Sequence, residues 1–129
     1  MRAFVFTGQG NEHSGMAKEL YDNNSFARDF IDKLDTNFNF KKVFVDESNL
    51  IHDTRYSQVG NFIISTILAK LLNDKGIYSD VCAGLSLGEY TALCYSKAIS
   101  VEDSISILES RSNIMYEALD GKDTGMYAI

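Results

Sequence analysis

The sequence lacks a long apolar run and an excess of basic residues, and each absence excludes a class of function. Its longest apolar stretches are far too short to span a membrane, and its first residues show no apolar core of a signal peptide. The formal net charge of −6, with no basic stripe, argues against binding to nucleic acid or to an anionic membrane surface. We therefore expect a cytoplasmic protein that has neither nucleic acid nor a membrane as a partner.

Cysteine is scarce and proline is absent. The two cysteines, Cys82 and Cys94, do not have the spacing of metal ligands. We interpret both as small buried apolar residues in a reducing compartment, so neither a disulfide nor a metal site is expected. The absence of proline excludes no function.

The 129 residues suffice for one domain at most, and the order of their apolar segments indicates its class. Short apolar runs alternate with segments of helical periodicity, which predicts an α/β layered fold with a parallel sheet. The run at 3–6 should be a strand that is buried on both faces. Helices are expected at about 16–21, 25–34, 61–73, directly behind Ser86, and 101–120.

Several residues mark the expected boundaries of these elements. Ser25 is a plausible N-cap, and Gly76 and Gly121 suit the ends of the helices before them. Ser100 with Asp103 resembles a weak capping box. Two short segments complete the prediction: 41–45 is either a strand or a loop, and 126–129 looks like the beginning of a strand.

The main functional signal lies between the last predicted strand and the helix behind it. A short apolar run ends in Gly84-Leu85-Ser86-Leu87-Gly88, and a helical pattern follows at once. A strand, a sharp turn and a helix around a G-x-S-x-G motif are typical of a nucleophile elbow, in which a strained turn exposes the serine hydroxyl. Gly84 and Gly88 are needed because strand and helix pass too close for a Cβ. We predict that Ser86 is a nucleophile; the alternative is a strand-to-helix loop with an incidental serine.

Two backbone N–H groups could stabilise an oxyanion beside this serine. One belongs to Leu87, which follows the nucleophile at the start of a helix. The other belongs to Gln9, in the glycine-rich loop that leaves the first strand at the same edge of the sheet. This loop does not match a dinucleotide-binding fingerprint, because His13 stands where the third glycine is required. A plain turn remains the alternative.

Arg111 and the histidines are the remaining candidates. The spacing of Arg111 places it on the apolar face of its helix, where a guanidinium needs an anion. That anion is either a carboxylate of the protein, in a structural salt bridge, or a carboxylate of the substrate. A general base is harder to find. His13 could approach Ser86, although a histidine in such a loop is more often solvated, and we interpret His52 as a surface residue.

These motifs occur in an order that resembles the malonyl-CoA:acyl carrier protein transacylases, which are related to the acyltransferase domains of fatty acid and polyketide synthases. The resemblance runs over essentially all 129 residues. It rests on four segments: Phe6-Thr7-Gly8-Gln9-Gly10, Tyr56-Ser57-Gln58, Gly84 to Tyr90, and Arg111 with Met115.

The resemblance implies both a reaction and a set of roles. Ser86 would take a malonyl group from malonyl-CoA and pass it to the phosphopantetheine thiol of an acyl carrier protein, with no bound cofactor. Gln9 and Leu87 would supply the oxyanion N–H groups. Arg111 would pair with the free malonyl carboxylate, and Gln58 matches a glutamine of the substrate pocket.

The sequence departs from the family pattern at several points. Leu85 stands where the family usually has histidine, and Thr7 and Val59 stand where it commonly has proline. The family's catalytic histidine lies far downstream in a second half of the hydrolase-like core, and no residue here matches it. We therefore expect an N-terminal fragment that is nearly inactive alone, with 1–124 in that core and 125–129 at the start of a small ferredoxin-like subdomain.

Two other functions compete with this interpretation. A serine hydrolase or thioesterase could use the same elbow. Alternatively, the chain is a non-catalytic fragment that self-associates or complements a missing C-terminal half. Self-association is expected in any case, because half of a parallel core leaves an apolar sheet edge unpaired.

Overall fold

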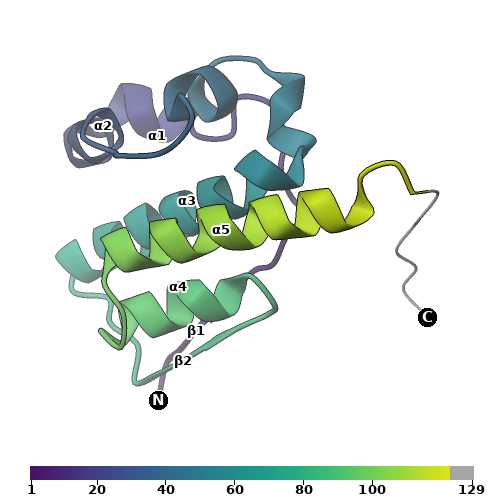
Figure 1. Ribbon diagram of the computed structural model, residues 1–129. Coiled ribbons are helices and arrows are strands. Elements are labelled where there is room, and N and C mark those ends of the chain that lie inside the picture. The colour runs from purple at the N-terminus through teal and green to yellow at the C-terminus, as the bar shows by residue number, and fades with distance from the viewer. Residues whose placement is uncertain (123–129) are drawn as a thin grey trace.

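The computed structural model describes residues 1–122 and combines a short sheet with helical layers (Figure 1). In chain order the elements are β1 (Ala3–Phe6), α1 (Lys18–Asn23), α2 (Ser25–Asp32), the π-helical turn η1 (Lys41–Val45), the 3-10 turn η2 (Asn49–His52), α3 (Thr54–Asp74), β2 (Val81–Gly84), α4 (Gly88–Tyr95) and α5 (Val101–Leu119). Helices α1 and α2 form one layer, α3 and α5 lie side by side in the middle, and α4 packs against both strands and against α3 and α5. This order confirms the predicted α/β class.

The two strands pair in parallel, as predicted. The register runs from Ala3 opposite Val81 to Phe6 opposite Gly84. Phe4 and Phe6 pack against Tyr95 of α4, with ring centroids 5.3 and 5.9 Å apart. Side chains alternate across a strand, so Val5 points to the other face and is 73% exposed. The expectation that this strand is buried on both faces is therefore wrong for the described residues, because α4 covers only one face.

Helix α3 begins at Thr54, well before the predicted start at residue 61. Asp53 caps it, since its carboxylate accepts a hydrogen bond of 2.9 Å from the backbone N–H of Arg55. The first turns of α3 contain Ser57 and Gln58, which are polar and yet buried. Their polarity concealed the helix from a search for apolar periodicity. No helix in the described part of the chain combines the length and the apolarity that membrane crossing needs.

Other boundaries agree with the sequence. Gly76 has a φ of 76° and ends α3 as predicted. Ser100 caps α5 by accepting a 3.0 Å hydrogen bond from the N–H of Asp103. Gly121, with a φ of 69°, follows the end of that helix. The strand expected at 126–129 lies outside the described residues.

The start of the second predicted helix needs a correction. The N-cap of α2 is Asn24, whose side-chain oxygen accepts a 2.9 Å hydrogen bond from the N–H of Ala27. Ser25, the predicted cap, is the first helical residue instead. Both residues are good caps, and the extended backbone of Asn24 decides between them.

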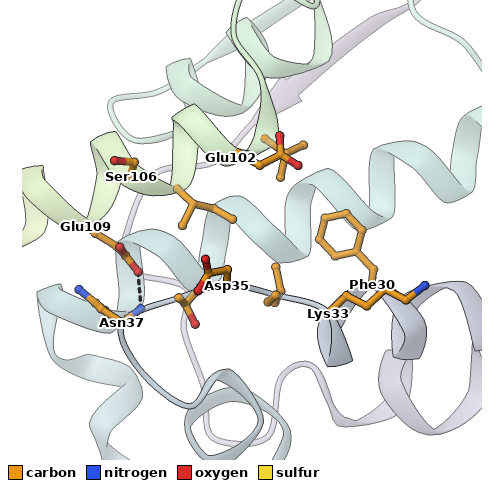
Figure 2. Close-up of a pocket in the computed structure, with 11 residues that line it drawn as sticks. Phe30, Lys33, Asp35, Asn37, Glu102, Ser106 and Glu109 are labelled. Carbon is orange, nitrogen blue, oxygen red and sulfur yellow. Dashed lines mark hydrogen bonds between the residues drawn. The ribbon is translucent and has the colours of Figure 1, made fainter.

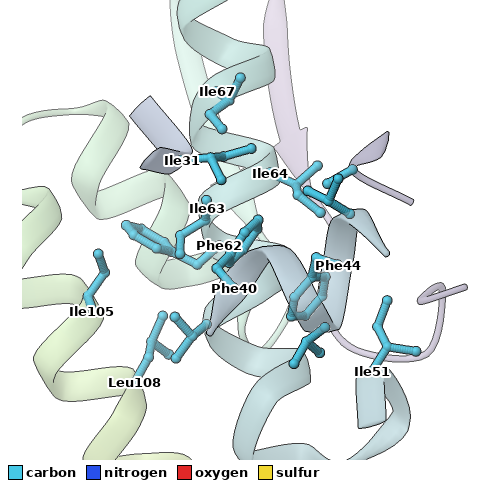
Figure 3. Close-up of a cluster of buried hydrophobic side chains, with 14 of the residues drawn as sticks. Ile31, Phe40, Phe44, Ile51, Phe62, Ile63, Ile64, Ile67, Ile105 and Leu108 are labelled. Carbon is cyan, nitrogen blue, oxygen red and sulfur yellow. The ribbon is translucent and has the colours of Figure 1, made fainter. Parts of the chain in front are cut away.

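The segment 41–45 is neither of the predicted alternatives, because it forms the π-helical turn η1. This turn places Phe44 in the core, where it is fully buried and stacks on Phe40 at a centroid distance of 4.8 Å (Figure 3). Phe44 also lies against α3 at Gly60, where a Cβ would be 1.8 Å from the ring. The glycine in the middle of a helix is thus explained by packing, which the sequence did not reveal.

Replacement of Gly60 by alanine should destabilise the protein by about 1–3 kcal/mol. The added methyl group overpacks the contact with Phe44, and this cost exceeds the gain of up to about 1 kcal/mol in helix propensity. Urea unfolding followed by circular dichroism measures the difference. The variant Phe44→Leu provides room, so Gly60→Ala should cost less in that background. Strict additivity of the two substitutions would contradict the proposed contact.

The start of α3 should depend on pH. Hydrogen bonds from the Arg55 side chain lower the pKa of Asp53 from its ordinary value of 3.8. The ionised carboxylate therefore stabilises the fold above pH 3.8 and loses this contribution as the pH falls through the lowered folded value. Asp53→Asn keeps a capping oxygen and should lose less stability on acidification, as measured by urea unfolding at a series of pH values. Equal losses in both proteins would contradict this role of the ion pair.

Candidate active site

Ser86 lies in the turn between β2 and α4. Its φ of 51° is in the left-handed region, a conformation that costs a residue with a side chain about 1–3 kcal/mol. The N–H of Leu85 binds the carbonyl of Phe6 at 3.0 Å, which extends the pairing of the strands into the turn. The side chain of Ser86 is exposed. The expected strained and accessible serine is therefore found at the predicted place.

Two glycines allow this turn by letting backbones approach each other closely. A Cβ on Gly84 would lie 2.0 Å from the carbonyl carbon of Gly88. A Cβ on Gly88 would lie 2.2 Å from the carbonyl oxygen of Phe6. The predicted reason for both glycines is confirmed, because no side chain fits between α4 and the strands at these points.

The glycine-rich loop after β1 meets the same turn. A Cβ on Gly8 would lie 3.0 Å from the carbonyl oxygen of Leu85 and 3.7 Å from the Cβ of Ser86. The side chain of Gln9 holds the loop, since its Nε2 donates to Ser57 Oγ at 2.7 Å and to Thr54 Oγ1 at 3.1 Å.

The two backbone N–H groups predicted to stabilise an oxyanion have no acceptor within residues 1–122. Neither Gln9 nor Leu87 donates a backbone hydrogen bond there, although their neighbours Gly10 and Gly88 do. Unpaired N–H groups beside an exposed serine can bind a developing negative charge.

Arg111 is held by Gln58 instead of by a carboxylate. Gln58 is fully buried, and its Oε1 accepts a hydrogen bond from Arg111 Nη1. Arg111 forms no ion pair with a carboxylate of residues 1–122. Its guanidinium carbon lies 5.9 Å from the centroid of the Tyr90 ring. Tyr90 belongs to α4 and follows Ser86 by four residues in the chain. The salt-bridge alternative for Arg111 therefore has no partner in the described residues.

Neither histidine forms a hydrogen bond to Ser86 in the described residues. His13 is exposed, and its Nδ1 lies 3.5 Å from the carbonyl oxygen of Asn11. His52 is exposed at the end of η2. Within the described residues, Ser86 lies against the loop at Gly8, Arg111 lies near Tyr90 of α4, and neither histidine forms a hydrogen bond to Ser86.

Comparison with known proteins assigns the family. The family model of the acyl transferase domain matches residues 3–128. The chain belongs to this family.

Relatives of this acyltransferase-family chain are considerably longer than it is. The malonyl CoA-acyl carrier protein transacylase of Bacillus subtilis is 32% identical over 130 residues, which cover 98% of this chain and 41% of the relative. The crystal structure of the transacylase from Clostridium perfringens has a TM-score of 0.79 at 31% identity, covering 90% of this chain and 38% of that one. A malonyl-transacylase solved in complex with a type II polyketide acyl carrier protein has a TM-score of 0.78 at 27% identity, covering 90% and 39%. This chain therefore spans about two fifths of the length of its curated relatives.

Thr54 and Ser57 form hydrogen bonds with two of the candidate site residues, and sequence reasoning gave neither of them a role. Thr54 Oγ1 accepts hydrogen bonds from the side-chain amides of Gln9 and Gln58 at 3.1 and 2.9 Å. Ser57 Oγ accepts one from Gln9 at 2.7 Å. Residues three and four positions apart on a helix face the same side, so Thr54, Ser57 and Gln58 could have been grouped from the sequence. That grouping requires a helix that begins at Thr54, and the predicted helix began too late.

No group of three or more side chains that could ligate a metal gathers within 1–122. Cys82 and Cys94 are free thiols, and burial raises the pKa of Cys94.

A cavity of about 630 Å³ lies between α5 and the segment that follows α2 (Figure 2), and it is separate from the candidate site residues. Its lining includes the carboxylates of Asp35, Glu102 and Glu109, with Lys33 as the basic residue. Glu109 accepts a 2.7 Å hydrogen bond from the backbone N–H of Asn37. This acidic lining is unsuited to the phosphates of a CoA thioester, and none of the candidate site residues contributes to it.

Ser86→Gly should stabilise the protein by about 0.5–1 kcal/mol. Glycine removes the left-handed strain, and the greater entropy of the unfolded chain offsets part of that gain. Lys97→Gly is the matched control, because Lys97 has a φ of 64° outside the site. Thermal unfolding of both variants measures the effect. A stabilised Lys97→Gly beside a destabilised Ser86→Gly would show that the Ser86 side chain makes stabilising contacts of its own.

Proposed function

We propose that this chain carries the nucleophile, the oxyanion donors and the carboxylate anchor of a malonyl transferase. The proposed enzyme moves a malonyl group from CoA to the phosphopantetheine thiol of an acyl carrier protein through an acyl-serine. The observation that carries the proposal is the placement of Ser86. It lies in a strained turn against the glycine-rich loop that contains Gln9. Tyr90, four residues after Ser86, lies near the guanidinium of Arg111.

The turn at Ser86 is proposed to act as a nucleophile elbow. Its Oγ attacks the thioester carbonyl carbon and loses its proton to a base. The carbonyl oxygen becomes an oxyanion that accepts hydrogen bonds from the N–H groups of Leu87 and Gln9. The carbon–sulfur bond then breaks, and the CoA thiolate leaves as a thiol by taking up a proton. In the second half, the carrier thiol gives its proton to the base and its sulfur attacks the acyl-serine carbonyl carbon. The carbon–oxygen bond of the ester then breaks, and Ser86 Oγ takes up a proton.

Arg111 is proposed to select the acyl group. A malonyl group has a free carboxylate and an acetyl group has none, so only malonyl can form a charge-assisted pair with the guanidinium. Gln58 occupies one N–H of Arg111 and leaves the others for a ligand. The relatives named malonyl CoA-acyl carrier protein transacylase support this substrate and an acyl carrier protein as the partner.

The base is proposed to come from outside the described residues. His13 and His52 are exposed and make no hydrogen bond to Ser86, so neither is placed to take its proton. Acylation of Ser86 by the chain alone is therefore expected to be slow. Loss of one member of a catalytic triad leaves a rate about 10³–10⁴-fold above that of water, supplied by the oxyanion hole and by binding.

Labelling of the 129-residue chain tests the proposal and the role of Arg111. Malonyl-CoA should acylate Ser86 slowly, and imidazole should accelerate the reaction by replacing the absent base; intact-mass and peptide mass spectrometry measure the product. Arg111→Ala should slow malonyl labelling about tenfold or more, the range that one charged hydrogen bond supports, and should leave acetyl labelling nearly unchanged.

Two controls accompany this labelling. Ser86→Ala should show no labelling, and Arg111→Lys keeps the charge while losing the forked geometry. Equal losses for both acyl groups in Arg111→Ala would assign Arg111 a structural role. Rapid loss of the acyl group to water, with no preference for a thiol acceptor, would favour a hydrolase.

A further inference from the structure

The two halves of the proposed site meet at one hydroxyl group. Thr54 is the first residue of α3, and its Oγ1 accepts one hydrogen bond from Gln9 and one from Gln58. Gln9 belongs to the loop against Ser86, and Gln58 binds Arg111. A hydroxyl oxygen has two lone pairs, and both are used here.

We propose that Thr54 is a positioning residue that orients the Gln58 amide, and through it Arg111, for recognition of a carboxylate. This inference rests on the proposed malonyl transfer, because it deepens the account of how the acyl group is selected.

The two ends of the Gln58 amide face different partners. Its Nε2 faces two acceptors, Thr54 Oγ1 at 2.9 Å and Met115 Sδ at 3.3 Å, while its Oε1 faces Arg111. Rotation of the amide by half a turn would place its NH₂ group against the guanidinium, donor against donor. Thioether sulfur is a weak acceptor, so the Thr54 hydroxyl is the stronger of the two groups that prevent this rotation. Because Gln58 is fully buried, water does not replace a lost partner easily.

Thr54 is less important for holding the loop at Gln9 than for positioning Arg111. The Nε2 of Gln9 has a second and shorter hydrogen bond of 2.7 Å to Ser57 Oγ, a side chain that is only 2% exposed. Loss of the Thr54 hydroxyl therefore leaves the Gln9 loop held by Ser57. The consequence should appear in the choice of acyl group more than in the overall rate.

The test compares Thr54→Val, which has nearly the same shape without the hydroxyl, with Thr54→Ser, which keeps it. Each is labelled with malonyl-CoA and with acetyl-CoA in the 129-residue chain, in the presence of imidazole. Thr54→Val should lower the malonyl-to-acetyl rate ratio about three- to tenfold, the range that one neutral hydrogen bond supports, and Thr54→Ser should retain it. Ser57→Ala serves as the matched control and should slow both donors to a similar extent, because it loosens the loop.

A second readout does not depend on activity. The side-chain NH₂ resonances of Gln58 should move in Thr54→Val and stay near their wild-type positions in Thr54→Ser. Thr54→Ala removes the same hydroxyl with less bulk and gives the same comparison if valine disturbs packing. In a Gln58→Met background, Thr54→Val should have no further effect on the ratio, because no amide remains to orient.

The outcomes separate this inference from the proposed function. An unchanged ratio in Thr54→Val, in an experiment where Arg111→Ala abolishes the preference, would overturn the role of Thr54 and leave malonyl transfer standing. Equal slowing of both donors with a lowered melting temperature would make Thr54 merely structural and would also overturn it. Absence of any malonyl preference in the wild type would overturn the proposed function, while the Gln58 resonances would still test the positioning.

Discussion

The structure depends on one close approach of backbones, where α4 begins against the end of β1. Gly88 lies so near the carbonyl of Phe6 that a Cβ would be 2.2 Å from its oxygen, and a Cβ on Gly84 would be 2.0 Å from the carbonyl carbon of Gly88. With strand and helix this close, the residue between them has little freedom, and Ser86 is driven into the left-handed region. The surrounding contacts over-determine this strain, which is the usual condition under which strained residues persist. The two glycines thus permit the turn in which the hydroxyl of the candidate nucleophile is exposed.

A second constraint is the burial of polar side chains on α3. An unsatisfied buried amide costs about 1–3 kcal/mol, so Gln58 can be fully buried only because each of its polar atoms has a partner. Those partners come from α3 itself and from α5, and they join the glycine loop to Arg111. The network therefore joins α3 to α5, and in the proposed function the same hydrogen bonds present a guanidinium to the substrate. The two roles share the same hydrogen bonds, which explains why polar residues occupy the inner face of a helix.

Sequence reasoning succeeded where the physical cause is local. The turn at Ser86, the glycines beside it and the cap at Ser100 follow from neighbouring residues and from short-range geometry. It failed where distant segments meet. The π-helical turn at 41–45 carries Phe44, which packs into the space left by Gly60, and no pattern within either segment shows that contact. The exposure of Val5 likewise depends on which face of the sheet is covered.

The sequence by itself determined the identity of the candidate nucleophile, because a strand, a G-x-S-x-G turn and a helix are specified by about ten consecutive residues. It also predicted which helix face carries Arg111, since helical spacing is a local property, and Arg111 is half-buried there. It left open what Arg111 meets there. Only the tertiary structure decided that its protein partner is the buried amide of Gln58 instead of a carboxylate of residues 1–122, and that Thr54 links this amide to the Gln9 loop. The physical reason is that a hydrogen bond between residues about fifty positions apart depends on how helices pack, and packing is a property of the whole core.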